Sequence, residues 1–205
     1  MSAPPSVVIF DLDGVIRDWN DDELAVLETS FGLEPGEIVT VAFDGELGRA
    51  ATTGELTYRV WMDEIRRRIM ARHGAGVAAA LDEWERNVGR VDIEMLTLLR
   101  SVRTLVPAVV LSNGTTRLRR DLYALDLTDE FDQIFNTAEI GIAKPEPAVF
   151  LHVLDELGRE PSEVVFIDDL AANVEGARSV GIRSHQHLGR EGTAAFLGEV
   201  GVVVD

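Results

Sequence analysis

Three short apolar runs, spread over most of the chain, each end in acidic or small polar residues. The run VVIF is followed by Asp11–Gly14, AVVL by Ser112–Thr115, and VVFI by Asp168 and Asp169. Apolar, β-branched runs of this length are typical of buried strands. In an open parallel sheet the carboxyl ends of neighbouring strands share one edge, and ligands bind in the crevice there. We therefore expect these polar residues to meet in space.

The three runs belong to a longer alternation of strands and helices. Helical periodicity fills most of the stretches between the predicted strands, which are Ser6–Phe10, Pro107–Leu111, Gln133–Phe135, Glu163–Ile167 and Val200–Val204. Such an alternation predicts an α/β fold with a Rossmann-like, mostly parallel sheet and helices on both faces.

The stretch from Trp19 to about Val88 interrupts this alternation, because no strand is predicted in it. Apolar residues recur there at helical spacing, among them Leu56, Val60, Trp61, Ile65 and Ile69. This pattern predicts an inserted α-helical cap over residues 19–88, and a core domain made of residues 1–18 and 89–205. Acidic residues early in the insertion, including Glu28, are expected to form a solvated helix face.

The overall charge restricts the partners that this chain can have. Thirty-six acidic and 19 basic residues give a net charge of −17, which repels nucleic acids and anionic lipid headgroups. No run approaches the roughly 20 apolar residues of a membrane span, so a cytoplasmic protein that binds neither nucleic acid nor membrane is expected. The absence of cysteine excludes disulfides and thiolate metal sites. We predict no particular oligomeric state.

The predicted site contains more negative charge than a partly buried crevice can hold by itself. Asp11, Asp13, Asp168 and Asp169 would place up to four carboxylates together, where their repulsion is less screened than in water. A cation must then be present, and oxygen ligands suit Mg²⁺. Lys144, which precedes a predicted helix, supplies a second positive charge within reach of the crevice.

These charges predict phosphoryl transfer with Asp11 as the nucleophile. A carboxylate is ionised at neutral pH and can attack phosphorus without a base, provided that the phosphate oxygens are neutralised. Mg²⁺ and Lys144 would neutralise them. Asp13, two residues further on, could protonate the leaving oxygen and then deprotonate the attacking water.

The turn after the second apolar run is the predicted phosphate-binding segment. The hydroxyl of Ser112 and the backbone N–H groups of the turn through Asn113 and Gly114 can hold the phosphate oxygens that Lys144 and Mg²⁺ leave free. Asn173, four residues past Asp169, is expected to form hydrogen bonds within the metal loop.

Four motifs in this order resemble those of the haloacid dehalogenase superfamily. They are Asp11-Leu12-Asp13-Gly14-Val15, Ser112-Asn113, Lys144-Pro145 and Asp168-Asp169. The helical insertion is similar to that of members with a first-position cap. The segments LSNGT and FIDDLAAN are similar to those of glucose-1-phosphate phosphatases and of the phosphatase domain of soluble epoxide hydrolases.

The resemblance implies a ligand set for Mg²⁺. The ion would be bound by the carboxylate of Asp11, the backbone carbonyl of Asp13 and the carboxylate of Asp169. Asp168 would lie behind these ligands or bind through water. The implied function is that of a hydrolase, a magnesium-dependent phosphatase that acts on a small phosphorylated metabolite, such as a sugar phosphate, through an aspartyl-phosphate intermediate.

Three residues are candidates for substrate contact. Arg17 and Trp19 follow the Asp11–Gly14 loop closely and are expected to roof the crevice. Arg49, in the insertion, either holds a second anionic or hydroxylated part of the substrate or forms a surface salt bridge.

Three alternative functions share this pattern. Phosphomutases of the β-phosphoglucomutase type carry Thr and His where this chain has Trp19 and Glu23. True haloacid dehalogenases replace the residue at the position of Asp13, so its presence favours phosphoryl chemistry. A non-catalytic regulator that binds phosphorylated metabolites would have no need of four intact motifs.

Overall fold

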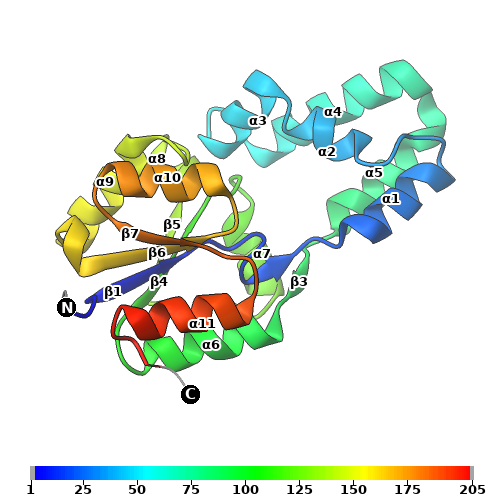
Figure 1. Ribbon diagram of the computed structural model, residues 1–205. Helices are drawn as coiled ribbons and strands as arrows, with labels where there is room; N and C mark the ends of the chain where they lie inside the picture. Colours follow the sequence, from blue (N-terminus) through cyan, green and yellow to red (C-terminus); the bar gives the residue numbers. More distant parts are fainter. Residues whose placement is uncertain (1–2, 204–205) are drawn as a thin grey trace.

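The computed structural model describes residues 3–203, and a five-stranded parallel sheet lies at its centre (Figure 1). The strand order is β5-β4-β1-β6-β7. The strands are β1 (Val7–Phe10), β4 (Ala108–Ser112), β5 (Gln133–Asn136), β6 (Val164–Asp168) and β7 (Arg183–Gln186). Every neighbouring pair runs parallel, so the predicted α/β fold with a mostly parallel sheet is confirmed.

Helices cover both faces of this sheet because its central strands are buried on both sides. On β1, Val8 and Phe10 pack into one hydrophobic cluster, while Val7 and Ile9 pack into another on the opposite face. Figure 1 shows α6 and α11 on one side and α8, α9 and α10 on the other. The elements of these layers are α6 (Ile93–Arg103), α7 (Leu118–Ala124), α8 (Thr137–Ile140), α9 (Pro147–Leu157), η2 (Pro161–Glu163), α10 (Ala171–Ser179) and α11 (Arg190–Glu199).

The last predicted strand, Val200–Val204, is wrong over its described residues. Helix α11 ends at Glu199, and Gly201 adopts a φ of 93°. The N–H of Val202 donates to the carbonyl of Leu197, which is the pattern of a Schellman helix end, and Val202 makes the accompanying apolar contact. The apolar run is thus a helix terminus. Val204 lies outside the described residues.

The fifth strand is instead β7, with the polar sequence RSHQ. It pairs with β6 through Ile167 and His185 among other residues. It is an edge strand, which forms backbone hydrogen bonds with β6 alone. Edge strands commonly carry polar and charged side chains, so no continuous apolar run is needed.

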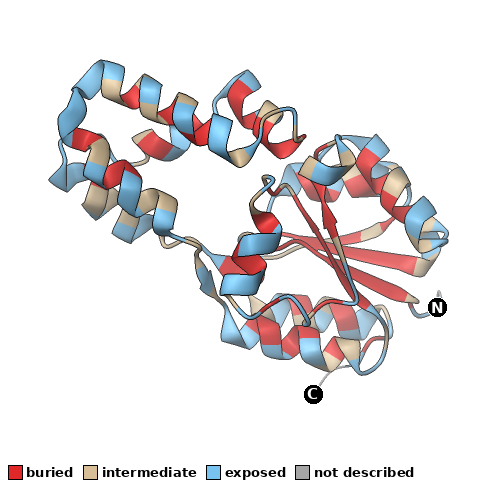
Figure 2. Ribbon diagram, turned by 180° about the vertical axis from the view of Figure 1, so that it is seen from behind, coloured by how far each residue is buried: buried red, intermediate tan, exposed pale blue. Residues whose placement is uncertain are grey.

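The segment between β1 and α6 contains the helices of the insertion, which pack around a core of their own. They are α1 (Asp21–Ser30), α2 (Glu37–Ala42), α3 (Gly45–Thr52), α4 (Tyr58–His73), η1 (Ala75–Val77) and α5 (Ala78–Arg86). Trp61, Ile65 and Ile69 of α4 are buried in a hydrophobic cluster separate from the two around the sheet. Figure 2 shows that the buried positions of these helices lie mainly on the faces that they turn toward one another. Within residues 3–203 no helix is long and apolar enough to cross a membrane.

Two short antiparallel strands carry the chain between the sheet and the insertion. In β2 (Arg17–Asp18) and β3 (Arg90–Val91), Arg17 pairs with Val91 and Asp18 with Arg90. This crossing lies close to the predicted boundaries. We therefore still propose residues 1–18 and 89–205 as the core and residues 19–88 as the cap.

Side-chain and backbone contacts hold the cap against the core. The hydroxyl of Thr137 donates to the carbonyl of Thr52 over 2.8 Å, and the backbone N–H of Tyr58 donates to the hydroxyl of Thr116 over 2.8 Å. Gly54 has a φ of 73° and lies so close to the carbonyl of Ala138 that any side chain would clash with it.

Glu28 was expected on a solvated helix face, and that expectation is wrong. Its side chain is fully buried. Its two carboxylate oxygens accept hydrogen bonds from the backbone N–H groups of Gly36 and Ile38, at the start of α2. These are donors that a helix N-terminus leaves unpaired. The local sequence did not predict this role, because the backbone N–H groups that bind Glu28 begin eight residues further along the chain.

Glu28→Ala should destabilise the cap, because two buried backbone donors would lose their acceptor. We expect a loss of about 2–4 kcal/mol in the free energy of unfolding, measured by denaturant titration followed by circular dichroism. Asp22→Ala, on the exposed face of the same helix, should cost less than about 1 kcal/mol. Equal effects of the two changes would contradict the capping role.

Candidate active site

The carboxyl ends of β1, β4 and β6 bring three aspartates together. Asp11 follows β1, and Asp168 and Asp169 lie at the end of β6. One carboxylate oxygen from each of Asp11, Asp168 and Asp169 lies within 4.8 Å of the others. Asp11 and Asp168 are buried, and Asp169 is partly exposed. A cluster of carboxylate oxygens of this kind suits a hard divalent cation.

Lys144 lies between two of these aspartates. Its Nζ is 2.7 Å from Oδ1 of Asp11 and 2.7 Å from Oδ2 of Asp168. The third donor of the ammonium goes to the carbonyl of Leu111, at 2.9 Å. All three of its hydrogens are therefore directed at fixed oxygens, and the group is held rigidly in the site.

Both carboxylate oxygens of Asp168 accept hydrogen bonds. Oδ1 accepts from the backbone N–H of Leu170 and from Nδ2 of Asn173, both at 2.9 Å. Oδ2 accepts from Asn173 at 3.0 Å and from Lys144. A carboxylate has about four lone-pair positions, so these contacts saturate it. This geometry fits a residue that orients Lys144 rather than one that binds an ion directly.

The pKa values of the site reflect burial first and charge second. Burial raises the pKa of Asp11 well above its usual range, and the charges of Asp168 and Asp13 add to this effect, while Lys144 opposes it. Burial also raises the pKa of Asp169, with Asp168 adding to the shift. Burial lowers the pKa of Lys144, but Asp11 and Asp168 outweigh it and the pKa is raised. A cation beside Asp11 and Asp169 would favour their ionised forms.

Gly14 allows the loop after β1 to approach the loop after β6. It has a φ of 80°, and a Cβ atom at this position would collide with the carboxylate of Asp169. Only glycine satisfies both the backbone conformation and the close approach.

Asp13 is not part of the cluster of three aspartates, and its side chain contacts Arg17 and Trp19. Its Oδ1 accepts from Nε of Arg17 at 2.6 Å and from Nε1 of Trp19 at 2.7 Å. Its Oδ2 accepts from Nη2 of Arg17 at 3.0 Å. Oδ2 therefore retains a lone pair that this pair of residues does not use. Arg17 and Trp19, predicted as substrate contacts, orient this carboxylate and also line the adjoining pocket. Their contact with substrate stays a prediction.

The loop after β4 contributes an unpaired hydroxyl and a positioning amide. Within residues 3–203 the buried Oγ of Ser112 has no hydrogen-bond partner. Such an orphaned polar group indicates a ligand oxygen. The side chain of Asn113 donates to the carbonyl of Lys144 at 2.9 Å and accepts from its N–H at 2.8 Å. Asn113 thus fixes the lysine loop. Phosphate binding by the backbone N–H of Asn113 stays a prediction.

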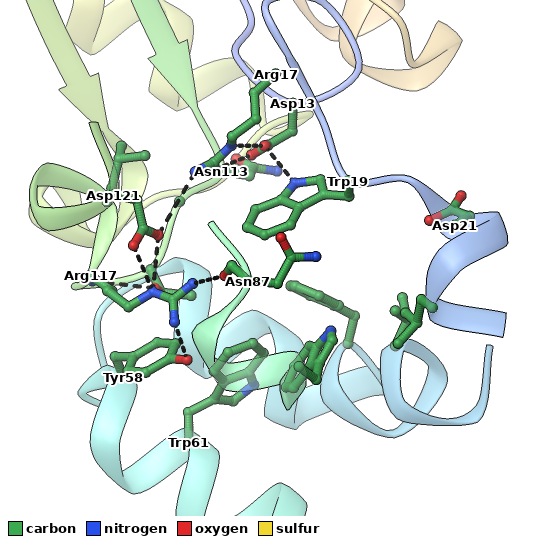
Figure 3. A pocket seen from close by; sticks show the side chains of 17 residues that line it. Asp13, Arg17, Trp19, Asp21, Tyr58, Trp61, Asn87, Asn113, Arg117 and Asp121 are labelled. Carbon is green, nitrogen blue, oxygen red and sulfur yellow. Dashed lines mark hydrogen bonds and ion pairs between the residues drawn. The ribbon is translucent and has the colours of Figure 1, made fainter. Parts of the chain in front are cut away.

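Arg117 and Asp121 were missed by sequence reasoning, although their spacing of four residues is that of a helical ion pair. Nε of Arg117 lies 2.9 Å from Asp121, and Nη1 of Arg17 lies 3.8 Å from the same carboxylate. Arg117 also donates to the hydroxyl of Tyr58 and to the backbone carbonyls of Glu85 and Asn87 in the cap segment. Figure 3 shows this connected series of contacts.

A pocket of about 180 Å³ lies between the cap and the core, beside Asp13 (Figure 3). Asp13, Asn113 and Gly114 line it at the core end. Its cap side is mostly apolar and includes Leu24, Val39, Phe43, Trp61 and Trp84, together with Trp19, Tyr58 and the polar residues Asp21 and Asn87.

Arg49 lies outside this pocket lining. Its guanidinium pairs with the carboxylate of Glu55, and both side chains are about half exposed. Of the two readings left open for Arg49, the structure therefore has the surface salt bridge.

Comparison with known proteins identifies the class to which this fold and site belong. The family model for haloacid dehalogenase-like hydrolases matches residues 5–181. The chain therefore belongs to the haloacid dehalogenase-like hydrolases.

Two relatives illustrate the range of this class. The chain is 28% identical over 196 residues to bifunctional epoxide hydrolase 2 of Rattus norvegicus. The matched region covers 86% of this chain but only 35% of the rat protein. The chain thus spans about a third of the length of the epoxide hydrolases it matches. It is also 28% identical over 180 residues to the sesquiterpene phosphatase astK of Aspergillus oryzae, with 85% of each chain covered.

Solved structures show the same fold. A haloacid dehalogenase family enzyme from Bacteroides thetaiotaomicron, in complex with magnesium and inorganic phosphate, superposes with a TM-score of 0.72 at 22% identity, covering 91% of this chain and 96% of that one. The L-2-haloacid dehalogenase from Xanthobacter autotrophicus superposes with a TM-score of 0.68 at 20% identity, covering 97% and 84%.

Lys144→Met should destabilise the metal-free protein strongly, because Asp11 and Asp168 would remain buried without their counter-charge. We expect a loss of about 3–5 kcal/mol at neutral pH, measured by denaturant unfolding in EDTA. The deficit should shrink as the pH falls, since protonation of Asp11 removes the uncompensated charge.

Arg49→Met is the control, and it should leave the unfolding midpoint unchanged because it breaks only an exposed pair. If Lys144→Met were as stable as the wild type, the buried ion pairs would not be needed to hold the site together.

Proposed function

We propose that this protein is a magnesium-dependent phosphatase that hydrolyses a small phosphomonoester through an aspartyl phosphate on Asp11. The observation that carries the proposal is the environment of Asp11. Its Oδ1 is held by Lys144 and by the backbone N–H of Leu12, both at 2.7 Å. Its Oδ2 takes part in neither contact, and is the oxygen we assign to the attack on phosphorus.

The residues present fit a magnesium ion. The carboxylates of Asp11 and Asp169 and the backbone carbonyl of Asp13 would hold it, and the saturated hydrogen bonding of Asp168 agrees with a supporting role. When bound, Mg²⁺ supplies positive charge to the phosphate oxygens and to the nucleophile, which keeps Asp11 ionised despite its burial.

Lys144 and Ser112 would stabilise the transferring phosphoryl group. The ammonium of Lys144 is fixed before substrate binds, so it can neutralise developing charge without reorganisation. The unpaired Oγ of Ser112 can donate to a phosphate oxygen. The backbone N–H groups that follow it, at Asn113 and Gly114, can serve in the same way.

Asp13 is proposed as the general acid and base. Protonated on Oδ2, it would give its proton to the leaving oxygen as Asp11 forms its bond to phosphorus. The resulting carboxylate would then take a proton from the water that hydrolyses the aspartyl phosphate. Arg17 contacts both carboxylate oxygens and Trp19 contacts Oδ1, so the orientation of the carboxylate is fixed.

The relatives support phosphoryl chemistry. The Bacteroides enzyme was crystallised with magnesium and inorganic phosphate, and the Aspergillus relative is named a phosphatase. A (S)-2-haloacid dehalogenase of Pseudomonas is 40% identical over 76 residues. We favour the phosphatase because this chain retains Asp13, whereas displacement of a halide needs no proton donor.

Phosphate release from an aryl phosphate should require Mg²⁺, because without a cation the carboxylate cluster repels the substrate. We expect activity to stop in EDTA and to return when Mg²⁺ is added in excess. Colorimetric release of the phenol measures both. Undiminished activity in a chelated, metal-free sample would contradict the metal assignment.

Asp13→Asn should separate the two halves of the reaction. The phenolate of an aryl phosphate leaves without a proton, so the first step should proceed, while hydrolysis of the aspartyl phosphate should slow by about 10² to 10⁴. Rapid mixing with an aryl phosphate should therefore give a burst of about one phenol per active site. A simple alkyl phosphate, which needs the proton, should give no burst.

The matched control is Asp18→Asn, at an exposed residue of the neighbouring strand β2 that lies outside the pocket lining. It should show wild-type turnover and no burst. Equal slowing of Asp13→Asn on both substrates, with no covalent phosphoenzyme detected by mass spectrometry, would remove Asp13 from acid–base catalysis.

A further inference from the structure

The pocket beside Asp13 has a wall of large apolar side chains from four different cap segments. Leu24 lies on α1, Val39 on α2, Trp61 on α4 and Trp84 on α5, and Phe43 directly follows α2. The rings are packed together: their centroids are 5.4 Å apart for Phe43 and Trp61, and 5.8 Å apart for Trp61 and Trp84. Val39 and Phe43 are substantially exposed to the pocket and solvent.

The core end of the same pocket places it on the leaving-group side of the proposed reaction. Asp13, Asn113 and Gly114 line this end. Asp13 is the residue assigned to protonate the leaving oxygen, so that oxygen must lie next to its carboxylate. The rest of the leaving group then extends toward the cap, into the aromatic wall.

The charged residues at the core end of the pocket are paired with one another, Arg17 with Asp13 and Arg117 with Asp121. Asp21, also in the lining, adds a negative charge that a second anionic group would face. Among residues 3–203, Nη1 of Arg17 is a buried donor without a hydrogen-bond partner, which can serve one substrate oxygen. A leaving group rich in hydroxyls would lose hydration against the apolar cap residues, where few polar groups can replace its water.

We propose that the substrate is a phosphomonoester of an apolar alcohol, rather than a sugar phosphate or a substrate with a second anionic group. This inference rests on the proposed phosphatase function. A cavity of about 150 Å³ holds one benzene ring, so the 180 Å³ of this pocket accommodate a leaving group of about six to eight carbons.

The first test is a series of linear alkyl phosphates with two, four, six and eight carbons, assayed with Mg²⁺ by phosphate release. Each buried methylene should raise kcat/KM about fourfold, so hexyl phosphate should exceed ethyl phosphate by about two orders of magnitude. Glucose 6-phosphate and 3-phosphoglycerate should fall well below hexyl phosphate. A flat series, or a sugar phosphate preferred over hexyl phosphate, would overturn the inference while leaving the phosphatase proposal intact.

Two valines of the cap give a matched pair of variants. Val39 and Val60 are 37% and 49% exposed, each on a cap helix, but only Val39 lines the pocket. Val39→Ser should lower the ratio of hexyl to ethyl phosphate turnover by at least about threefold, and Phe43→Ser should lower it more. Val60→Ser should leave the ratio unchanged. Equal ratios in the two valine variants would show that this wall does not contact the substrate.

A binding measurement tests the pocket without relying on catalysis. The chain has three tryptophans, and all of them, Trp19, Trp61 and Trp84, line the pocket. Titration with hexylphosphonate, which cannot be hydrolysed, should change the intrinsic fluorescence and saturate at a concentration about two orders of magnitude below that of ethylphosphonate. If no phosphate ester were hydrolysed but hexylphosphonate still bound more tightly than ethylphosphonate, the phosphatase proposal would be wrong and the pocket would still be shown to bind apolar groups. Equal affinities for the two phosphonates would overturn the inference.

Discussion

The buried ammonium of Lys144 is the interaction on which the rest of the site depends. It contacts Asp11 after β1, Asp168 at the end of β6 and the carbonyl of Leu111 on β4. A buried charge is costly unless its partners are correctly placed, so a change in the register of any of these strands would leave ions unpaired. The same contacts that fix the sheet edge also orient Asp11, the proposed nucleophile, so in this proposal stability and reactivity depend on one set of groups.

Around Lys144, chemically identical carboxyl groups differ in how many of their oxygens are free, because their hydrogen-bond partners differ. Asp168 is saturated by Lys144, Asn173 and the N–H of Leu170, and acts as an anchor. Asp11 keeps one oxygen outside its contacts with Lys144 and Leu12. Asp13 contacts Arg17 and Trp19 and is not part of the group formed by Asp11, Asp168 and Asp169. The residues that we propose as nucleophile, anchor and acid thus differ in their partners, although all four aspartates occur in just two motifs.

The sequence predicted the sheet and its functional edge because both follow from local pattern: buried strands read as apolar runs, and the polar residues come directly after them. It failed where the outcome depends on distant parts of the chain. The edge strand β7 has no apolar run, and the run at Val200 is a helix end stabilised by Gly201. Glu28 is buried only because a loop farther along the chain returns to it.

The pocket between cap and core could not be predicted from the motifs, because its two walls have different origins. The core wall contains charges that cancel in pairs, Arg17 with Asp13 and Arg117 with Asp121, and Arg117 continues to the cap through Tyr58. The cap wall is aromatic. The proposed phosphoryl transfer needs only the core wall and the strand ends, so the motifs are consistent with many leaving groups. In our proposal the cap side chains select the leaving group. Their helical spacing predicted only a hydrophobic core, but several of them also line the pocket.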